Sequence, residues 1–337
     1  MKTYRFDHLD SLDGLVAHDE DTPEPRANEV LVRVRASSLN YRDLAILNGT
    51  YPMTVEPDLI PLSDGAGEVA ATGADVTRFK VGDRVAGTFF PRWYGGRVEI
   101  SRYLSEQYGS DRDGWLCTHK VVDQEALVSI PDHLGFEEAA TLPCAALTAW
   151  TTLHGPTPLM PGDTVLTLGA GGVSLFALQL AKLCGARVIA TTSSPAKEKI
   201  LKDLGADETI NYLETPDWDQ TVRELTAGRG VDRVVEVGGP GTLAKSIRAT
   251  TILGEVGLIG FLAGGQEPVN FMDLFMGGAA IRRIAVGSRD DFETMNRAIA
   301  YHKLAPKIDA VFPFDEAKQA WRHFESRKNV GKVVIAH

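Results

Sequence analysis

Hydrophobic and polar residues follow two different rhythms along this chain. Up to about residue 132 they alternate with period two, most clearly in Glu29–Ala36. Such alternation places every second side chain on one face and predicts a half-buried strand. Gly65–Gly73 and Phe79–Val85 are also expected to be short strands separated by turns. The first part of the chain is therefore predicted to be rich in β structure.

From Phe136 to about Gly287 short apolar runs alternate with segments of helical periodicity. Strands are expected at Thr164–Leu168, Arg187–Thr191, Arg233–Val237, Glu255–Ile259 and Arg282–Val286, and helices at Ala196–Leu204, Asp217–Thr226 and Thr242–Thr250. This order predicts an α/β fold with a doubly wound parallel sheet, which binds ligands at the carboxyl ends of its strands. Further expected elements are the helices Phe292–His302 and Asp315–Arg327, the strand Lys332–Ala336 and an extended loop, Phe89–His119.

The first strand of this region leads into a glycine-rich turn. Gly169, Gly171, Gly172, Val173 and Ser174 form it, and an amphipathic helix that ends at Gly185 follows. Backbone N–H groups at a helix start lack partners within the helix and lie at its positive end. A pyrophosphate can approach them where side chains are missing. Although Ser174 replaces the third glycine of the dinucleotide fingerprint, the flanking strand and helix favour a nucleotide site over a purely structural turn.

The end of the next strand bears on which dinucleotide binds. Enzymes selective for NAD usually carry Asp or Glu there to bind the ribose hydroxyls. No acidic residue occurs between Gly171 and Ser194, and the strand ends in the hydroxyl residues Thr192, Ser193 and Ser194. One interpretation is that the serines only cap a helix. The other is that Ser193, Ser194 and Lys197 bind a 2′-phosphate, which favours NADP(H) over NAD(H).

Composition narrows the class of protein. The 337 residues are 44% hydrophobic and 24% charged, which fits a globular protein of about two domains. A net charge of −10 and dispersed basic residues argue against a nucleic-acid or membrane partner. The N-terminus lacks the apolar core of a signal peptide, and no apolar run reaches the length of a membrane span. Three widely separated cysteines argue against a disulfide framework and for a cytoplasmic location.

Several motifs together carry a resemblance. They are Asn40-Tyr41-Arg42-Asp43, Gly49-Thr-Tyr51-Pro52, Pro61–Glu68, Val81–Val85, Ala139–Trp150, the glycine turn and Gly331–Val334. With these motifs in this order, the chain resembles the medium-chain dehydrogenase/reductase superfamily, and within it the zinc-independent, quinone-oxidoreductase-like branch. The resemblance implies a GroES-like, partly open β-barrel catalytic domain of residues 1–132 and 288–337, with a Rossmann domain of residues 133–287 inserted in it. It also implies an active site in the cleft and a homodimer joined through the Arg282–Val286 strands.

Zinc-dependent members of the superfamily hold a catalytic zinc ion through two cysteines and a histidine. The resemblance places Asn40 at the first cysteine position, Ser63 at the histidine position, Cys144 at the remaining cysteine position and Asp64 at a neighbouring glutamate position. The extended loop contains only Cys117, whereas a structural zinc loop would need four close cysteines. Because zinc sites need three or four well-placed N or S ligands, no bound metal is expected. Cys144 is interpreted as a small residue in the wall of the cleft.

Without a metal, other donors must stabilise the negative charge that develops on a substrate oxygen during hydride transfer. The candidates are Tyr41, Arg42, Tyr51 and Asn40, of which Asn40 could instead bind a cofactor hydroxyl. Alternatives stay open. The tyrosines could be ordinary half-buried aromatics, and Arg42 could form a structural ion pair with Asp43. Asp64 could orient Arg42 or belong to a turn.

The resemblance adds cofactor contacts outside the glycine turn. It places Thr148 on the nicotinamide side and Tyr212 at the adenosine phosphate end. Backbone groups at Gly238, Gly260 and Phe261 could approach the ribose and carboxamide, and Ser288 and Arg289 could reach cofactor or substrate. Lys332 is interpreted as a phosphate contact or, more commonly for such a residue, as a surface lysine.

These features favour an NADPH-dependent oxidoreductase that acts on quinones, enones or related small carbonyl compounds. Charge delocalised over such a substrate can be stabilised by weaker donors than simple alcohol oxidation requires. An NAD(P)-dependent alcohol dehydrogenase is the second hypothesis. A nucleotide-binding redox sensor without catalysis is the third.

Overall fold

The computed structural model describes residues 1–99, 106–263 and 268–337. They form two compact units, one of Met1–Leu147 with Val286–His337 and the other of Thr148–Ala285. The first unit extends beyond residue 132, where the sequence placed a domain boundary. The reason is that α3 (Phe136–Ala139) packs against β3 (Glu29–Ser38) and β4 (Asp64–Thr72).

The second unit contains a six-stranded parallel sheet in the order β10-β9-β8-β11-β12-β13. The strands are β8 (Thr164–Leu168), β9 (Arg187–Thr192), β10 (Glu208–Asn211), β11 (Val231–Glu236), β12 (Thr250–Leu258) and β13 (Ala280–Arg283). Every residue of β8 is buried, as expected for a parallel strand covered on both faces. The strand order reverses between β8 and β11, which is the ligand-binding switch point of a Rossmann fold.

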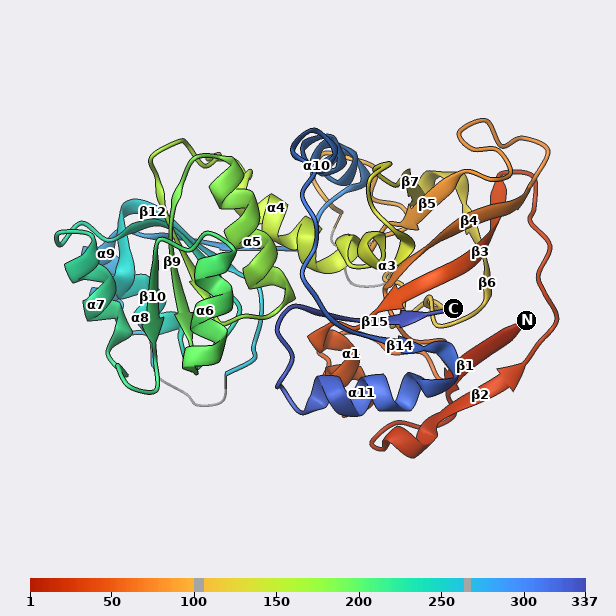
Figure 1. Cartoon of the computed structure of the whole chain (residues 1–337), viewed down its shortest axis with the longest axis horizontal. Helices are drawn as coiled ribbons and strands as arrows, with labels where there is room; N and C mark the ends of the chain where they lie inside the picture. Colours follow the sequence, from red (N-terminus) through yellow and green to blue (C-terminus); the bar gives the residue numbers. More distant parts are fainter. Residues whose placement is uncertain (100–105, 264–267) are drawn as a thin grey trace. The chain divides into compact units, whose positions relative to one another are not determined.

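Helices cover both faces of this sheet. Figure 1 shows α5 (Gly172–Leu183) and α6 (Pro195–Asp203) on one side and α7 (Trp218–Leu225), α8 (Leu243–Ala249) and α9 (Phe271–Gly277) on the other. Helix α4 (Leu147–Leu153) precedes β8 in the chain. Helix α5 buries Leu175, Phe176 and Leu178 in the core. The Ser174 hydroxyl donates to the carbonyl of Leu168 (2.7 Å), so the residue that replaces the third glycine ties α5 to β8.

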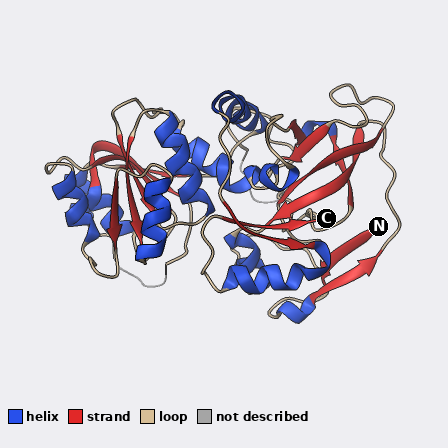
Figure 2. Ribbon diagram, viewed as in Figure 1, coloured by secondary structure: helices blue, strands red, loops and turns tan. Residues whose placement is uncertain are grey.

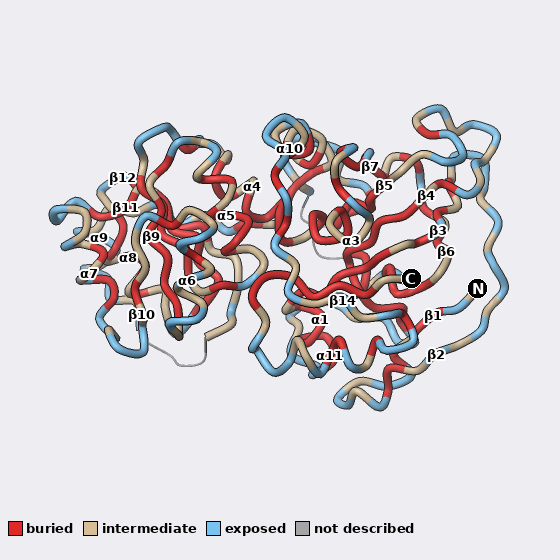
Figure 3. The backbone as a smooth tube through the Cα atoms, in the orientation of Figure 1, coloured by how far each residue is buried: buried red, intermediate tan, exposed pale blue. Residues whose placement is uncertain are grey.

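The first unit is built on a seven-stranded sheet in the order β14-β15-β3-β4-β5-β7, with β6 paired to β3. Its remaining strands are β5 (Arg84–Gly87), β6 (His119–Asp123), β7 (Leu127–Ser129), β14 (Ile308–Pro313) and β15 (Lys332–Ala336), and β1 (Lys2–Phe6) pairs separately with β2 (Leu15–Asp19). Its other α-helices are α1 (Tyr41–Leu47), α10 (Arg289–His302) and α11 (Ala317–Glu325). Short 3₁₀ helices are η1 (Leu12–Gly14), η2 (Gln124–Ala126) and η4 (Phe314–Glu316), and η3 (Leu142–Ala146) is a short π-helix. Figure 2 shows how these elements surround the sheet, and Figure 3 shows that β3 is largely buried.

Two expected strands are wrong in position. The strand expected at Arg282–Val286 is β13, which ends at Arg283, because it pairs in register with β12 and Val286 has a positive φ of 58°. The strand expected at Phe79–Val85 is β5, which begins at Arg84, because Gly82 (φ 91°) forms a turn before it. Within the expected loop Phe89–His119, residues 100–105 lie outside the described residues, and the described part contains no helix or strand before β6. No helix in the described ranges is long and apolar enough to cross a membrane.

Candidate active site

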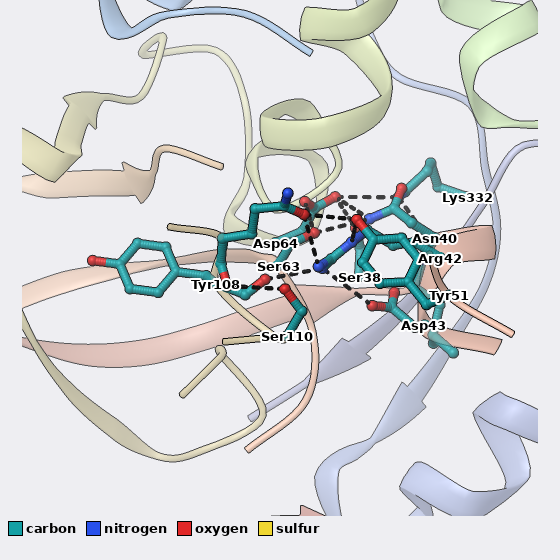
Figure 4. Close-up of polar contacts among 12 residues, drawn as sticks. Ser38, Asn40, Arg42, Asp43, Tyr51, Ser63, Asp64, Tyr108, Ser110 and Lys332 are labelled. Carbon is teal, nitrogen blue, oxygen red and sulfur yellow. Dashed lines mark hydrogen bonds and ion pairs between the residues drawn. The ribbon is translucent and has the colours of Figure 1, made fainter. Parts of the chain in front are cut away.

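Three strands of the first unit bring buried polar residues together. Ser38, at the end of β3, pairs with Asp64 of β4 on one side and Val334 of β15 on the other. Lys332 begins β15, and Asn40 precedes the first residue of α1. Their side chains converge in Figure 4. We call Ser38, Asn40, Ser63, Asp64 and Lys332 the polar centre.

Hydrogen bonds connect every member of the polar centre. Asp64 Oδ2 accepts from Asn40 Nδ2 (2.8 Å), Ser38 Oγ (3.1 Å) and Lys332 Nζ (3.3 Å), and Asp64 Oδ1 accepts from Ser63 Oγ (2.9 Å). Lys332 Nζ also donates to the Leu39 carbonyl and to Asn40 Oδ1, both at 2.7 Å. The side chains of Lys332 and Asp64 are 3% and 0% exposed. Such buried charges persist only when they are paired and hydrogen-bonded, as they are here.

The expected ion pair between Arg42 and Asp43 is present, with 3.8 Å between Arg42 Nη1 and Asp43 Oδ1. The other carboxylate oxygen of Asp43 accepts the N–H of Asn40 (2.7 Å). Burial raises the pKa of Asp43 to about 6, and Arg42 and the Asn40 N–H oppose this shift. Asp43 therefore balances the charge of Arg42 and fixes the start of α1.

Arg42 binds Tyr51 and the loop before β6. Its Nε donates to Tyr51 OH (3.3 Å), Nη1 to the Tyr108 carbonyl (2.9 Å) and Nη2 to Gln107 Oε1 (3.4 Å). Tyr51 OH donates to the same Gln107 oxygen at 2.6 Å. Arg42 is buried, whereas Tyr51 is partly exposed. A partly exposed phenol beside a fixed guanidinium is suited to stabilise negative charge on a bound oxygen.

Tyr41 is partly buried and packs against the core of the first unit. Its hydroxyl is 3.5 Å from Arg327 Nη2, and the Arg327 guanidinium lies 5.7 Å from the centroid of its ring. These contacts favour the interpretation of Tyr41 as an ordinary half-buried aromatic. Asp64 is not a turn residue, since it begins β4, and within the described residues its side chain binds the polar centre rather than Arg42.

Three residues that the sequence interpretation missed complete the site. Ser38 and Gln107 received no role there, and Lys332 was interpreted as a phosphate contact or a surface lysine. The surface interpretation is wrong, because Lys332 is 2% exposed. A signal was available, since Lys332 is the one charged residue of the apolar strand Lys332–Ala336.

The polar centre does not fit a zinc ion. At the positions that the resemblance assigns to zinc ligands stand the amide of Asn40 and the hydroxyl of Ser63, both poor ligands for zinc. Burial, with Asp64, raises the pKa of Cys144, so its thiol stays protonated. The Lys332 ammonium already binds Asn40 and Asp64. Within the described residues no group of three or more His, Cys, Asp or Glu side chains could hold a metal ion.

In the second unit the glycine turn connects β8 to α5. Gly169 adopts a positive φ of 75°, which favours glycine, and its N–H donates to the Thr191 carbonyl (3.0 Å). A Cβ placed on Gly169 or Gly171 would meet no atom within 4 Å, so space is open beside both residues. Helix α5 begins at Gly172, and the N–H groups of its first turn have no partner within the helix. These are the properties that a phosphate site at a helix start needs.

After the end of β9, Ser194 caps helix α6, as one of the two interpretations of the serines expected. Ser194 precedes α6 in an extended conformation, and its hydroxyl accepts the N–H of Lys197 (3.4 Å). Ser193 takes no part in this cap. The N–H of Tyr212 donates to the Thr192 carbonyl (2.9 Å), which places Tyr212 beside the end of β9. Thr192 and Tyr212, two candidates for the adenosine end, therefore lie at the ends of adjacent strands.

A buried carboxylate that the sequence interpretation missed shapes the turn after β11. Glu236 Oε1 accepts the N–H groups of Gly238 and Gly239, each at 2.8 Å, and the Thr242 hydroxyl at 2.6 Å. The Glu236 carbonyl accepts the N–H of Gly260 (3.3 Å), so two cofactor candidates lie on neighbouring segments. Phe261 follows with 41% exposure. Thr148, the remaining candidate of this unit, is buried.

Ser288 and Arg289 belong to the first unit and have structural partners. The Ser288 hydroxyl donates to Asp291 Oδ2 (2.6 Å) and caps α10. Arg289 forms ion pairs with Glu125 and Glu293, and its guanidinium lies 5.1 Å from the centroid of the Tyr94 ring. Their contact with a cofactor stays a prediction.

Comparison with known proteins assigns the family. A protein-family model described as "Alcohol dehydrogenase GroES-like domain" matches residues 26–132, and a second family model, described as "Zinc-binding dehydrogenase", matches residues 172–301. A zinc-type alcohol dehydrogenase-like protein of Schizosaccharomyces pombe is 40% identical over 336 residues, covering 98% of this chain and 97% of the relative. The chain belongs to the medium-chain dehydrogenase/reductase superfamily. A quinone oxidoreductase of Pseudomonas aeruginosa, 33% identical with 94% of both chains covered, supports the quinone-oxidoreductase-like branch.

Solved structures support the same fold. An NAD-dependent alcohol dehydrogenase superimposes with a TM-score of 0.90 at 34% identity, and a mycobacterial protein complexed with NADPH does so with 0.83 at 29%. Both comparisons cover 100% of this chain and 100% of the other. The expected α/β fold, a Rossmann sheet together with a GroES-like domain, is confirmed. The protein is an oxidoreductase of this superfamily, whose members bind nicotinamide cofactors.

Proposed function

We propose that this protein is a zinc-independent, NADPH-dependent oxidoreductase that reduces quinones, enones or related small carbonyl compounds. The observation that carries the proposal is the Arg42–Tyr51 pair, a fixed cation beside a partly exposed phenol. Such a pair can stabilise the oxygen of a substrate that gains a hydride. Bound NADPH would supply that hydride.

For the cofactor, we propose that the first turn of α5, from Gly171 to Ser174, binds the pyrophosphate. The open space beside Gly169 and Gly171 supports this role. Thr192, Ser193, Ser194, Lys197 and Tyr212 would bind the adenosine end, where the absence of an acidic residue between Gly171 and Ser194 favours NADP(H). Thr148, Gly238, Gly260, Phe261, Ser288 and Arg289 remain proposed contacts for the rest of the cofactor.

For the substrate, we propose that Tyr51 OH and Asn40 Nδ2 bind the oxygen that becomes negative. Tyr51 OH has one hydrogen, which would turn from Gln107 Oε1 (2.6 Å) to the bound oxygen. Asn40 Nδ2 has two hydrogens. One is directed to Asp64 at 2.8 Å, and the other has only a long contact of 3.5 Å with Ser63 Oγ. A substrate oxygen could replace the weaker contact without disturbing the stronger one. Arg42 would act through Tyr51, because its Nε donates to Tyr51 OH (3.3 Å) and a hydroxyl that accepts such a bond is a stronger donor.

Steady-state oxidation of NADPH and NADH with quinones, enones and aldehydes tests the proposal, and alcohols with NADP+ or NAD+ test its main alternative. We expect turnover with NADPH and a conjugated carbonyl, undiminished by a chelator. Faster turnover of alcohols with NAD+ would support the alcohol dehydrogenase hypothesis, which the NAD-dependent structural relative favours. Cofactor binding without turnover of any substrate would leave the redox-sensor hypothesis.

We also propose a cytoplasmic homodimer. Helix α9 leaves Phe271, Phe275 and Met276 about two-thirds exposed or more (71%, 70% and 66%), and Ile252 and Leu253 of β12 are 70% and 88% exposed. Helix α9 contacts β12, so these residues form one apolar surface next to the edge strand β13. Large apolar surfaces and open strand edges are usually covered by a partner. A second copy of the chain, and a reducing compartment for the three free cysteines, fit these features.

A further inference from the structure

We propose that the ammonium group of Lys332 is the resident cation of the polar centre, where it balances Asp64 in place of a metal ion and positions Asn40. The superfamily includes zinc-dependent members, and a relative that covers nearly the whole of this chain is named a zinc-type alcohol dehydrogenase-like protein. The residues of the polar centre depart from that description.

The hydrogen-bond count supports a filled cation site. A lysine ammonium has three donors and no acceptor. Lys332 Nζ has three acceptors, the Leu39 carbonyl and Asn40 Oδ1 at 2.7 Å and Asp64 Oδ2 at 3.3 Å. Every donor is therefore used within the protein. Lys332 cannot bind substrate in this arrangement, so it acts as a positioning residue through its neighbours.

The charges support the same conclusion. Lys332 balances Asp64, and Arg42 balances Asp43, so these four buried groups form two neutral pairs. A divalent cation would add two positive charges beside an ammonium in a region of low effective dielectric constant. Its gain from the amide of Asn40, the hydroxyl of Ser63 and the single thiol of Cys144 would be small, because zinc sites need three or four N or S ligands. The polar centre therefore stabilises Lys332 and disfavours zinc.

The contact with Asn40 links this cation to the proposed reaction. An amide can lie in two orientations that exchange its oxygen and nitrogen, and the neighbouring donors decide between them. Lys332 donates to Asn40 Oδ1, so Nδ2 points to Asp64 and Ser63. Lys332 thereby keeps an N–H group of Asn40, rather than its oxygen, available as a donor. This step alone rests on the proposed function.

Metal content gives the first test. The full-length protein is incubated with excess Zn²⁺ or Co²⁺, desalted and analysed for metal, and the Co²⁺ sample is examined for thiolate charge-transfer absorption. We expect far less than one metal ion per chain and no such absorption. About one chelator-resistant ion per chain that disappears in Cys144→Ser would overturn the proposal. An ion retained in Cys144→Ser binds elsewhere, and the proposal stands.

A double-mutant cycle with variants that neutralise each charge gives the second test. Lys332→Gln and Asp64→Asn are each compared with the double variant by thermal unfolding. Removing one partner leaves a buried charge uncompensated, so we expect each single variant to melt roughly 3–10 °C lower. The double variant should recover at least half of that loss. If instead its loss equals the sum of the two, the residues do not act as a charge pair and the proposal fails.

Matched variants keep this result interpretable. The exposed pair Lys199–Asp203 (2.7 Å) serves as the control, and Lys199→Gln should lower the melting temperature by less than about 2 °C. Should Lys332→Gln not fold, Lys332→Arg keeps the charge. It must then fold and exclude Co²⁺ as the wild type does, and uptake of Co²⁺ by Lys332→Arg would count against the proposal. Neither readout depends on hydride transfer, so failure here is distinguishable from failure of the proposed function.

Discussion

At the scale of single residues, exposure separates the groups that can meet a substrate from those that support them. Arg42, Asp43 and Lys332 are buried, and each forms hydrogen bonds with protein partners. Tyr51 is partly exposed and connects to the buried set through Arg42 and Gln107. We therefore propose that Tyr51 is the group that meets the substrate oxygen, and that Arg42 acts on it through their hydrogen bond.

This assignment predicts the effect of Tyr51→Phe. The substitution keeps the ring and removes the hydroxyl, so a charge-stabilising donor is lost while the packing of the ring is kept. We expect kcat/KM for a conjugated carbonyl to fall roughly 10- to 1000-fold. The dissociation constant for NADPH, measured by fluorescence, should stay the same.

Tyr301→Phe is the matched control, because Tyr301 lies on α10 with 84% exposure and should leave both quantities unchanged. Wild-type kinetics in Tyr51→Phe would remove this phenol from the mechanism. A weaker binding of NADPH in that variant would instead show that Tyr51 serves the cofactor.

The sequence predicted part of the site at this scale. Motif positions gave Asn40, Arg42, Tyr51 and Asp64, and hydrogen bonds join Asn40 to Asp64 and Arg42 to Tyr51. The motifs could not give the partners. Lys332 reaches Asp64 because β15 and β4 both pair with β3, and that pairing joins residues far apart in the chain. Long-range pairing of this kind leaves no local pattern in one sequence.

At the scale of elements, the β9–α6 connection separates a helix cap from a phosphate site. Ser194 caps α6, whereas Ser193 lies outside the cap. A new carboxylate at Ser193 would repel a 2′-phosphate and could bind ribose hydroxyls without breaking the cap. We expect Ser193→Asp to shift the ratio of kcat/KM for NADPH to that for NADH by at least roughly tenfold toward NADH.

Ser326→Asp, on the exposed end of α11, adds the same charge far from β9 in the sequence and in the other compact unit. It should leave the cofactor ratio unchanged. Tighter or equal binding of NADH by the wild type would contradict the phosphate interpretation before any substitution is made.

Local patterns predicted β8, β9, β11 and β12 because each of these strands contains a short apolar run. β8, expected at Thr164–Leu168, has those bounds. The strand at Arg282–Val286 was displaced because β13 is an edge strand with half-buried and exposed residues, so burial gives little pattern. Helix α1 was not predicted either. Its seven residues are nearly all buried, and such a helix lacks the polar face that marks an amphipathic one.

At the scale of the whole molecule, acid should destabilise the first unit through His337. Its Nδ1 donates to the Cys117 carbonyl (3.1 Å) and its Nε2 accepts from Ser37 Oγ (2.9 Å), which describes a neutral imidazole. Burial lowers the pKa of His337 from 6.5 to about 3. The unfolded chain therefore takes up this proton more readily than the folded chain. The contribution of His337 to stability is complete above about pH 6.5 and falls as the pH decreases toward 3.

Melting temperatures of the wild type and His337→Gln between pH 7.5 and roughly pH 4.5 test this linkage. The variant should lose less stability on acidification, because it has no proton to take up at this position. His323→Gln, which changes a more exposed histidine paired with Asp309, is the control. Burial also lowers the pKa of His119 and His154, so some acid sensitivity should remain. Parallel pH profiles for wild type and His337→Gln would contradict the assignment.

The apolar surface of α9 makes the homodimer testable. Phe271 and Phe275 stack with 5.9 Å between ring centroids, and both are exposed in the single chain. Burying them in a partner removes apolar area from water, and a charge placed among them would have to be desolvated on association. Phe275→Glu should therefore convert a dimer into a monomer in light scattering, with the fold retained in circular dichroism. Tyr301→Glu carries the same charge on α10 and should stay dimeric. If the wild type is monomeric at micromolar concentration, or if Phe275→Glu remains a dimer, then something other than a second copy covers this surface.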